Sequence, residues 1–551
     1  MIQTQEQQAI TTFSRGNIGS LIVEALAGTG KTTTLIEIIK VLLQPSTLVL
    51  AFNKLIAQDM LSRLPPMPKN RVVHVKTLHA AGYWITKKHF PGLSIDRDIT
   101  EQRIREAAGD GTPFRVLGAS TKLLRLVKDF QHARKLNLDE TWVLGHEFDV
   151  FAKLAGPHEV QRVVEIVDRA YRASLEVGKV IDFPDQGWLP LVLDLEPPSR
   201  YKAIVLDEAQ DINENQLAMV ERLLAPGGRI IAAGDLNQQI YGWRGAAGRE
   251  VWERLIGHHK ARRFPLTITW RCDKAIVAQA NELVPTLRAR PDAGPGAVYK
   301  SDEGSFYSTL DATNDEGGTI FVLSRNNAEL LRVALEMWRR KLMFNVAQSG
   351  DMLTPIKTIL NKLLKDWDTP RMPTIKPGED AAIEEALSLF HLRRQQGESQ
   401  AASMAMKAGV STTPAKAQFQ QKLAAWYMSE SMKAQGAGSA SWAERIEDQH
   451  KMILYALAYV RDPREIEGVL ENIFLYDDAC WITLSTVHKA KGLEADHVYL
   501  LRETFRRHQN RRDRDGNKLP VDREELNVEY VAITRARKSL TWVTLDQGAA
   551  T

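Results

Sequence analysis

Two short segments of this chain carry residue types suited to the chemistry of a nucleoside triphosphate. The first, EALAGTGKT at residues 24–32, places two glycines before a lysine and a threonine. Glycines let backbone N–H groups turn toward phosphates, Lys31 can reach the terminal phosphate oxygens, and the Thr32 hydroxyl can hold Mg²⁺. The residues predicted to contact the nucleotide here are Ala27, Gly28, Thr29, Gly30, Lys31, Thr32 and Thr33. An ordinary glycine turn is the alternative, which the flanking strand and helix patterns disfavour.

The second segment, DEAQD at residues 207–211, follows the apolar run 203–206. An acidic pair at the end of a buried strand lies at the carboxyl edge of a parallel sheet, where phosphates bind. We expect Asp207 to hold Mg²⁺ through water and Glu208 to act as the base for the attacking water. A solvated acidic turn that caps a following helix is the alternative. The glycine-rich segment upstream favours the catalytic interpretation.

Both segments need a parallel sheet to position them, and the hydrophobic pattern predicts one. Strand and helix patterns alternate over the first 80 residues, fade over residues 86–197 into amphipathic helices, and then resume. A second α/β pattern begins near residue 264 and is interrupted after residue 347. The predicted strands lie at residues 19–25, 48–52, 72–75, 202–207, 229–234, 319–323, 481–485, 498–501 and 540–543. The expected fold class is therefore α/β, with two parallel-sheet cores, each interrupted by a mainly helical insertion.

Composition excludes several other classes of protein. The 551 residues are 44% hydrophobic and 25% charged, as in a globular protein, and a net charge of +4 gives no global basic field. Two cysteines, Cys272 and Cys480, exclude a disulfide framework and a zinc site built from cysteines. They suit a reducing cytoplasm. The polar residues 3–8 do not resemble a signal peptide, and no apolar run reaches the roughly 20 residues of a membrane helix.

A series of ordered motifs resembles superfamily 1 DNA helicases of the UvrD/Rep/PcrA type. Beside the two segments above, the motifs are TQEQ at 4–7, AFNK at 51–54, TLH at 77–79, GDLNQQIYGWRGA at 234–246, TWR at 269–271, STVHKAKGLE at 485–494 and EYVAITRAR at 529–537. AFNK also resembles the F-box DNA helicase branch, although no F-box-like segment precedes it. The resemblance implies two RecA-like motor domains that use ATP and Mg²⁺.

The resemblance assigns catalytic roles to three further residues. Gln238 would sense the terminal phosphate, and Arg271 and Arg535 would be arginine fingers supplied by the second core. Such a finger is worth roughly 10³–10⁵ in rate. Two planar cations in separate segments suit a site that closes between two domains. A surface salt bridge is the alternative for each arginine.

Other matching positions would hold the base and sugar of ATP. Gln7 would hydrogen-bond adenine, with Gln8 as the rival because the spacing is one residue short of the commoner pattern. Trp270 would stack on adenine and Glu494 would bind the ribose. Many relatives carry an arginine where this chain has Thr33. We therefore expect the base to be held from one side only, with a less strict preference for ATP.

A single-strand translocase needs flat side chains for bases and hydrogen-bond donors for phosphates. The residues predicted to contact DNA are Phe52, Asn53, His79, Tyr241, Trp243, Arg244, Thr486 and His488. By resemblance, Trp243 stacks on a base. Core packing is the alternative for the aromatic residues, but Trp243 lies in a polar segment. Residues 502–518 carry a local net charge of +4 and are either a phosphate contact or a solvated loop.

The resemblance also predicts domain boundaries. The first motor domain would comprise residues 1–85 and 198–263, with a helical insertion at 86–197. The second would comprise residues 264–347 and 476–551, with a reduced helical insertion at 348–475.

The leading functional hypothesis is an ATP-dependent DNA helicase that moves 3′ to 5′ on single-stranded DNA and unwinds tailed or forked duplexes, in a bacterial or phage-type cytoplasm. One alternative is a translocase that strips recombination proteins from DNA with little unwinding. Another is a nucleic-acid-sensing ATPase subunit that serves a separate nuclease in a defence complex. We expect any nuclease to be a partner protein, because only about fifteen residues follow Arg535.

Overall fold

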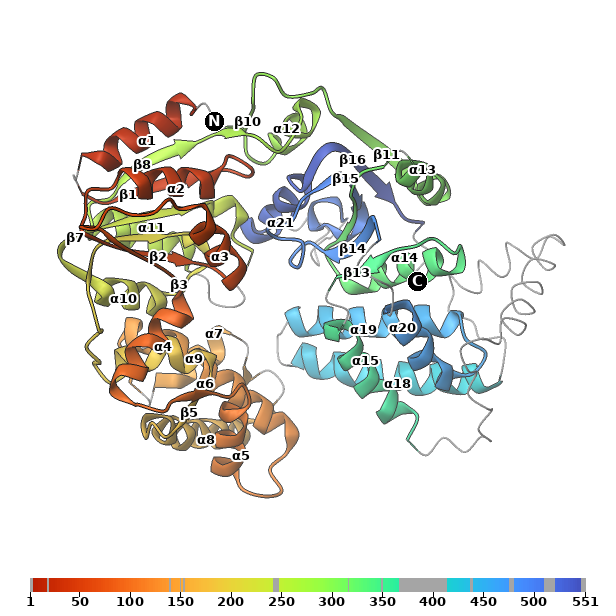
Figure 1. Cartoon of the computed structure of the whole chain (residues 1–551). Coiled ribbons are helices and arrows are strands. Elements are labelled where there is room, and N and C mark those ends of the chain that lie inside the picture. Colours follow the sequence, from red (N-terminus) through yellow and green to blue (C-terminus); the bar gives the residue numbers. More distant parts are fainter. Residues whose placement is uncertain are drawn as a thin grey trace. The chain divides into compact units, whose positions relative to one another are not determined.

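The computed structural model describes two compact units, the first within residues 1–296, 436–438 and 521–534 and the second within residues 297–435, 439–520 and 535–551 (Figure 1). The described residues are 3–16, 19–137, 140–148, 150–151, 154–240, 247–315, 317–347, 350–365, 414–436, 440–474, 480–509 and 521–546. No helix in these ranges is long and apolar enough to cross a membrane.

Six parallel strands form the sheet of the first unit, in the order β3-β2-β6-β7-β1-β8. They are β1 (Leu21–Ala25), β2 (Ser46–Ala51), β3 (Val72–Thr77), β6 (Tyr201–Leu206), β7 (Leu224–Gly234) and β8 (Arg262–Leu266). The inner strands read as continuous apolar runs because helices cover both faces of the sheet. Alternate residues of one strand therefore enter opposite cores: Leu21 and Val23 pack in one cluster and Ile22 in the other.

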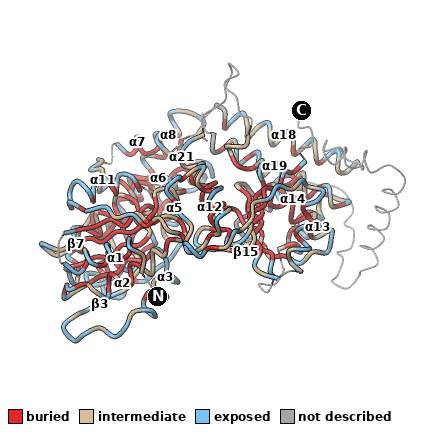
Figure 2. The backbone as a smooth tube through the Cα atoms, turned by 90° about the horizontal axis from the view of Figure 1, so that it is seen from above, coloured by how far each residue is buried: buried red, intermediate tan, exposed pale blue. Residues whose placement is uncertain are grey.

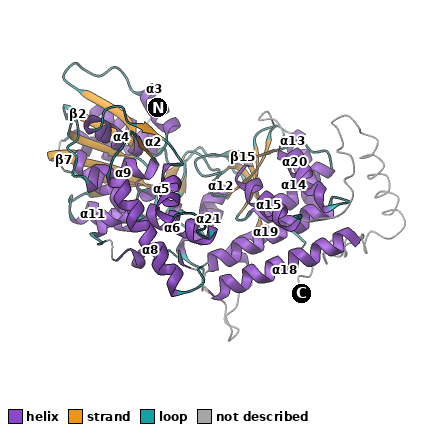
Figure 3. Ribbon diagram, turned by 90° about the horizontal axis from the view of Figure 1, so that it is seen from below, coloured by secondary structure: helices purple, strands orange, loops and turns teal. Residues whose placement is uncertain are grey.

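Two sets of helices supply these cores (Figure 3). One set is α1 (Gln5–Arg15), α2 (Lys31–Val41) and α3 (Lys54–Arg63). The other set is α4 (Leu78–His89), α9 (Phe183–Val192), α10 (Glu214–Leu223) and α11 (Gly248–Gly257). Short 3₁₀ turns η3 (Ala209–Asp211) and η4 (Leu236–Gln238) follow β6 and β7. The glycine-rich turn, η3 and η4 therefore all follow the carboxyl ends of parallel strands.

A helical insertion lies between β3 and β6. Its elements are β4 (Ser94–Ile95), α5 (Ile99–Ala108), α6 (Phe114–Arg134), α7 (Thr141–Glu147), α8 (Pro157–Leu175) and β5 (Val180–Ile181), followed by α9. Its apolar core includes Leu123, Val127, Ile166 and Trp188. Within it, Lys128 is fully buried, with its ammonium 2.6 Å from a carboxylate oxygen of Asp185.

The first unit continues beyond residue 263 and also takes in a segment near the chain's end. These elements are β9 (Ile268–Thr269), α12 (Lys274–Ala280), β10 (Arg288–Ala289) and α21 (Arg523–Ile533). The sequence-based boundary at residue 264 falls inside β8, which pairs along its length with β1. Residues 264–296, which the sequence assigns to the second core, therefore group with the first unit.

The second unit contains another six-stranded parallel sheet, in the order β11-β16-β15-β12-β14-β13. The strands are β11 (Ala297–Asp302), β12 (Ile320–Ser324), β13 (Asn345–Val346), β14 (Ile482–Thr486), β15 (Ala495–Leu501) and β16 (Ala536–Thr544). The helices are α13 (Glu303–Asp315), α14 (Asn327–Arg339), α15 (Gly350–Leu363), α18 (Pro414–Gly436), α19 (Ala440–Ala458) and α20 (Ile466–Phe474). In the view of Figure 2, the backbone around β15 is mostly buried.

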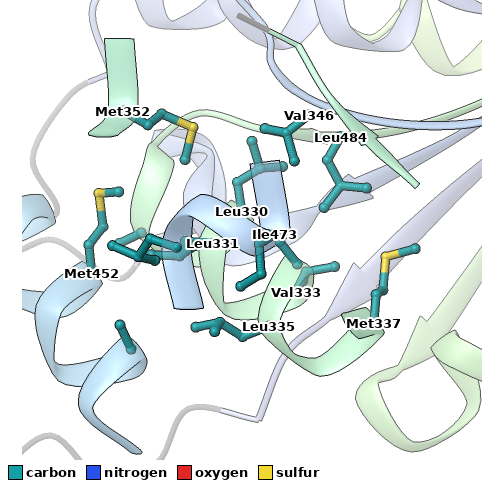
Figure 4. Close-up of a cluster of buried hydrophobic side chains, with 14 of the residues drawn as sticks. Leu330, Leu331, Val333, Leu335, Met337, Val346, Met352, Met452, Ile473 and Leu484 are labelled. Carbon is teal, nitrogen blue, oxygen red and sulfur yellow. The ribbon is translucent and has the colours of Figure 1, made fainter. Parts of the chain in front are cut away.

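Helix α14 joins the sheet of this unit to its inserted helices (Figure 4). Its apolar residues Leu330, Leu331, Val333, Leu335 and Met337 are all buried. They share one cluster with side chains from β13, β14, α15, α19 and α20, which include Val346, Leu484, Met352, Met452 and Ile473. The predicted α/β class, with two parallel sheets and helical insertions, is confirmed.

Candidate nucleotide and DNA site

The glycine-rich turn joins β1 to α2 and has a backbone that only glycine adopts easily. Gly28 and Gly30 have φ of 70° and 79°. A Cβ atom at Gly28 would lie 2.5 Å from Thr269 Oγ1 and 2.7 Å from Arg271 Cβ, so no larger residue fits there. Gly30 caps α2 without a side-chain hydrogen bond. Because a helix leaves its first N–H groups without intrahelical partners, this turn can bind an anion.

Lys31 begins α2 and contacts both acids that follow β6. Its ammonium lies 3.3 Å from Asp207 Oδ1 and forms an ion pair with Glu208 Oε2. Burial lowers the pKa of Lys31, but the negative charges of Asp207 and Glu208 outweigh this effect and the pKa is raised overall. Lys31 therefore stays protonated and offers a fixed positive charge beside the turn.

The acids fit a divalent cation. Asp207 is 2% exposed, and its buried Oδ2 receives no hydrogen bond from the described part of the chain. Burial raises the pKa of Asp207, which marks an oxygen that lacks full compensation. Carboxylate and hydroxyl oxygens with retained waters are the ligands that Mg²⁺ prefers, so Asp207 and Thr32 suit that ion.

Glu208 is held in a strained and directed conformation. Its φ of 51° is rare for a residue other than glycine, and such strain persists where the surroundings impose it. Gln210 Nε2 donates to Glu208 Oε2 at 2.6 Å, while Gln210 Oε1 accepts from the backbone N–H of Asp235 at 3.1 Å. Asp235 Oδ2 in turn accepts from Gln238 Nε2 at 2.8 Å. One hydrogen-bonded chain thus connects Glu208 with Gln238, two residues that the sequence predicts to be catalytic.

The side chain of Gln7, and not that of Gln8, faces the start of α2. Gln7 Nε2 donates to Thr34 Oγ1 at 3.1 Å, whereas Gln8 donates to the backbone of Gln3 at the exposed side of α1. A Cβ built on Gly30 would lie 3.6 Å from Gln7 Nε2 and 3.8 Å from Trp270 Cδ1. Gln7 and Trp270 therefore converge beside Gly30.

A cation that the sequence analysis did not single out lies next to Thr33. Arg63, at the end of α3, donates from Nη2 to Thr33 Oγ1 at 2.9 Å and pairs with Asp59 at 3.1 Å. Its side chain is 40% exposed. Thirty residues separate Arg63 from Thr33, and no local pattern joins them. Thr33 stands where many relatives carry an arginine, and Arg63 places a guanidinium beside that position.

The two arginines predicted as fingers belong to different units. Arg271 lies in the first unit, where the Trp270 N–H donates to the Gly28 carbonyl at 2.8 Å and Arg271 Nη1 donates to the Thr534 carbonyl at 3.0 Å. This differs from its expected place in the second core, because β8 and β9 continue the first unit. Arg535 belongs to the second unit, is 1% exposed and donates to the Leu493 carbonyl at 2.8 Å.

Glu494, the predicted ribose ligand, also lies in the second unit. It forms an ion pair with Arg537. The pKa of Arg537 is raised, chiefly by its hydrogen bond to Glu494.

Several predicted DNA contacts lie near the carboxyl ends of strands. Phe52 follows β2 and is 43% exposed, which is unusual for a large aromatic ring. Asn53 caps α3 by accepting from the Ile56 N–H at 2.9 Å, so its side-chain oxygen is already engaged. Thr486 ends β14 in the second unit and is largely buried, and His488 follows it. Tyr241, Trp243 and Arg244 lie outside the described residues, as do residues 510–520 of the basic stretch.

His79 has neighbours that the sequence did not reveal. Its ring meets that of Phe183 edge to face at 5.8 Å, and the Arg97 guanidinium lies 5.5 Å from the Phe183 ring centre. Phe183 is 40% exposed at the start of α9. Burial lowers the pKa of His79, which favours the neutral ring. An exposed ring with a cation beside it has the character of a base-stacking surface.

Comparison with known families decides the assignment. Residues 2–251 match the model of the UvrD/REP helicase N-terminal domain, and residues 386–547 match that of the UvrD-like helicase C-terminal domain. The chain belongs to the UvrD/REP-type superfamily 1 helicases. The family that the ordered motifs suggested is thus confirmed.

Curated relatives of this helicase family are distant. DNA helicase II of Escherichia coli K12 is 25% identical over 358 residues, which cover 56% of this chain and 47% of the relative. ATP-dependent DNA helicase PcrA of Staphylococcus aureus Mu50 is 22% identical over 341 residues, 57% of this chain and 44% of the relative. The chain spans about half the length of the curated relatives it matches.

Proposed function

We propose that this chain is an ATP-dependent DNA helicase that moves 3′ to 5′ along single-stranded DNA and unwinds tailed duplexes. The observation that carries the proposal is the cluster of Lys31, Asp207 and Glu208 at the end of two parallel strands, beside a turn built to bind an anion. Its membership of a DNA helicase family supplies the substrate class.

The proposed mechanism starts with exchange of partners at Lys31. The N–H groups at the start of α2 hold the phosphates, and Lys31 leaves the two acids to pair with the terminal phosphate. Glu208, released from that ion pair, accepts the proton of the attacking water while Gln210 keeps its carboxylate oriented. Asp207 and Thr32 would hold Mg²⁺, which would supply positive charge to neutralise the phosphates.

Other side chains complete the proposed nucleotide site. Gln7 hydrogen-bonds the base, Trp270 stacks on one face of it, and Arg63 approaches from the side of Thr33. Arg271, in the first unit, stabilises the charge that develops on the phosphate during hydrolysis. Arg535 and Glu494 belong to the second unit, where Arg535 acts on the same charge and Glu494 binds the ribose. Gln238 senses whether the terminal phosphate is present, and the segment that follows Gln238 responds to this difference.

The proposed DNA track runs over the residues near the strand ends. Phe52 and Phe183 offer flat surfaces to bases, and Trp243 stacks on a base next to Arg244. Stacking on an aromatic side chain is worth about 1–3 kcal/mol per base and does not depend strongly on sequence.

The decisive experiment measures ATP hydrolysis with and without oligo(dT) for the wild type and Lys31→Ala. We expect single-stranded DNA to stimulate the wild type, and the variant to lose hydrolysis by at least about 1,000-fold because phosphate charge goes unpaired. Circular dichroism checks that the variant is folded. DNA-stimulated turnover by folded Lys31→Ala would refute the site.

Strand displacement on bare duplexes with a 3′ or a 5′ tail then tests the DNA activity. We expect unwinding from the 3′ tail only. Removal of a recombinase filament without unwinding of a bare 3′-tailed duplex would instead favour a protein-stripping translocase.

A further inference from the structure

Three side chains that can bind a metal ion meet in the first unit, between the ends of α10 and α11. Glu221 lies near the end of α10, and His258 and His259 directly follow α11. Strands β7 and β8 begin a few residues further on, at Leu224 and Arg262. The cluster therefore lies at the amino edge of the parallel sheet, whereas the proposed nucleotide site lies at the carboxyl edge.

The distances between these side chains suit a four-coordinate zinc ion. Glu221 Oε1 lies 2.9 Å from His259 Nε2 and 3.7 Å from His258 Nδ1, and the three atoms all lie within 4.8 Å of one another. Tetrahedral bonds of about 2.0–2.2 Å place two ligand atoms roughly 3.3–3.6 Å apart, which falls between the two measured distances. Small changes of side-chain torsion angles therefore suffice to seat one ion among the three atoms.

The turn after α11 brings two adjacent histidines to one carboxylate. The Ala261 N–H donates back to the Leu255 carbonyl at 3.0 Å, and Lys260 has a φ of 53°, a left-handed conformation common where a helix ends. This turn fixes the backbone of both histidines. His258 faces Glu221 with Nδ1 and His259 faces it with Nε2, so the two rings approach it with different reach.

The carboxylate of Glu221 is ionised and already oriented. Arg254 Nε donates to Oε1 at 2.9 Å, and Arg254 Nη2 pairs with Oε2. Burial raises the pKa of Glu221, but the hydrogen bonds from His259 and Arg254 outweigh this effect and lower the pKa overall. A carboxylate has about four lone-pair sites, so a bidentate arginine leaves room for a metal ion. Carboxylate ligands of metals commonly have such a hydrogen-bonding partner behind them.

We propose that Glu221, His258 and His259 form a binding site for Zn²⁺ or a similar divalent transition metal. Imidazole and carboxylate ligands suit zinc, whereas Mg²⁺ prefers oxygen ligands alone. The side chain of His258 is 71% exposed, so the ion enters from solvent and water completes its coordination. The bound ion joins α10 to the end of α11, and its role is to stabilise the packing of these helices.

Titration of the untagged, metal-stripped protein with Zn²⁺ tests this site, in a buffer with excess Mg²⁺ to fill the oxygen ligands at Asp207. We expect the wild type to bind about one more Zn²⁺ per chain than the double variant His258→Ala/His259→Ala. Glu221→Gln should weaken binding at least about 10-fold, since loss of an outer-shell partner alone costs about 10–100-fold. His158→Ala, at an exposed histidine of α8, is the matched control and should bind zinc as the wild type does.

Hydrogen exchange then locates the bound ion. Because an ion that binds only the folded cluster stabilises it, we expect saturating Zn²⁺ to slow exchange of the amides at the end of α11 at least about 3-fold in the wild type. The double variant His258→Ala/His259→Ala should show no such change. Both variants replace exposed or partly exposed side chains, and circular dichroism checks that they are folded.

Equal zinc binding by the wild type and the folded double variant would overturn the site, because the ion would then be held elsewhere. Zinc binding that leaves exchange at the end of α11 unchanged would do the same. Lys31→Ala should bind zinc as the wild type does, since Lys31 lies at the opposite edge of the sheet. Failure of the proposed helicase function would therefore leave this test unaffected.

Discussion

At the residue scale, the nucleotide site combines one strong charge cluster with a base pocket assembled from distant positions. Lys31 lies between two acids in a partly buried cluster, where loss of Lys31 would leave two neighbouring carboxylates without their cation. The proposed base side comprises Gln7, Trp270 and Arg63, which come from three separate segments of the chain. Arg63 stands beside Thr33, and we propose that it approaches the base from the side opposite Trp270.

The position of Arg63 predicts that its side chain strengthens binding of ATP but not of a ligand that lacks the base. A guanidinium over an aromatic base contributes about 0.5–2 kcal/mol, so we expect Arg63→Ala to raise the Kd for ATP by about 2- to 30-fold. The Kd for tripolyphosphate, which has no base, should not change. Fluorescence titration with both ligands measures the ratio.

Arg172→Ala is the matched control, because Arg172 forms the same kind of exposed i,i+4 ion pair, with Asp168. Adding Thr33→Arg to Arg63→Ala should restore the affinity for ATP, since it places the cation on α2 itself. Equal weakening of ATP and tripolyphosphate in Arg63→Ala would argue against a contact with the base.

At the scale of elements, helix α6 attaches the helical insertion to the sheet domain through polar contacts. Asn215 of α10 accepts from the Ala133 N–H at 2.8 Å and donates to the Lys128 carbonyl at 2.7 Å. Beside them, Asn213 Nδ2 donates to Asp129 Oδ1 at 3.1 Å. Burial raises the pKa of Asp129 to about 7.

This shift predicts a pH-dependent attachment. The unfolded carboxyl has a pKa near 4, so between about pH 4 and pH 7 the folded state retains a proton that the unfolded state releases. Stability is therefore full below about pH 4 and is lost as the pH rises through about 7, by up to about 4 kcal/mol. Asp129→Asn should remove this loss, because an amide oxygen still accepts from Asn213.

Hydrogen exchange of the α6 amides at pH 5.5 and pH 8 measures this local stability without assuming two-state unfolding. We expect protection, after correction for intrinsic exchange, to fall with pH in the wild type and to stay level in Asp129→Asn. Asp59→Asn, at an exposed carboxylate, should behave as the wild type. A slope that persists in Asp129→Asn would assign the effect to another group.

At the scale of the whole molecule, the proposed motor needs groups from both units. Arg535 is buried in the second unit, and its planar guanidinium cannot be replaced by a lysine in bidentate contacts. We expect Arg535→Lys to lower kcat by about 10³-fold with the Kd for ATP within about 3-fold, as for a lost arginine finger. Single-turnover hydrolysis with a nucleotide-binding titration separates the two quantities.

Arg464→Lys, at an ion pair elsewhere in the second unit, is the control and should keep wild-type kcat. If Arg535→Lys weakens binding of ATP and leaves kcat unchanged, Arg535 holds the ground state and is not a finger.

The sequence by itself determined the fold class and the charged cluster. Continuous apolar runs predict strands of a sheet covered on both faces, and the ends of β1 and β6 then place Lys31, Asp207 and Glu208 together. This follows because the carboxyl ends of parallel strands share one edge. The family could also be predicted from the ordered motifs, because each motif is a short continuous segment of the sequence.

Only the tertiary structure decided which residues meet across long separations. It turned Gln7, and not Gln8, toward Thr34 through the orientation of α1, brought Arg63 to Thr33, and grouped Arg271 with the first unit through the pairing of β8 with β1. The tertiary structure also packs α21 against the turn at Leu236–Gln238, which lies nearly 300 residues earlier in the chain. Such contacts depend on helix orientation and strand order, which packing fixes and no local pattern records.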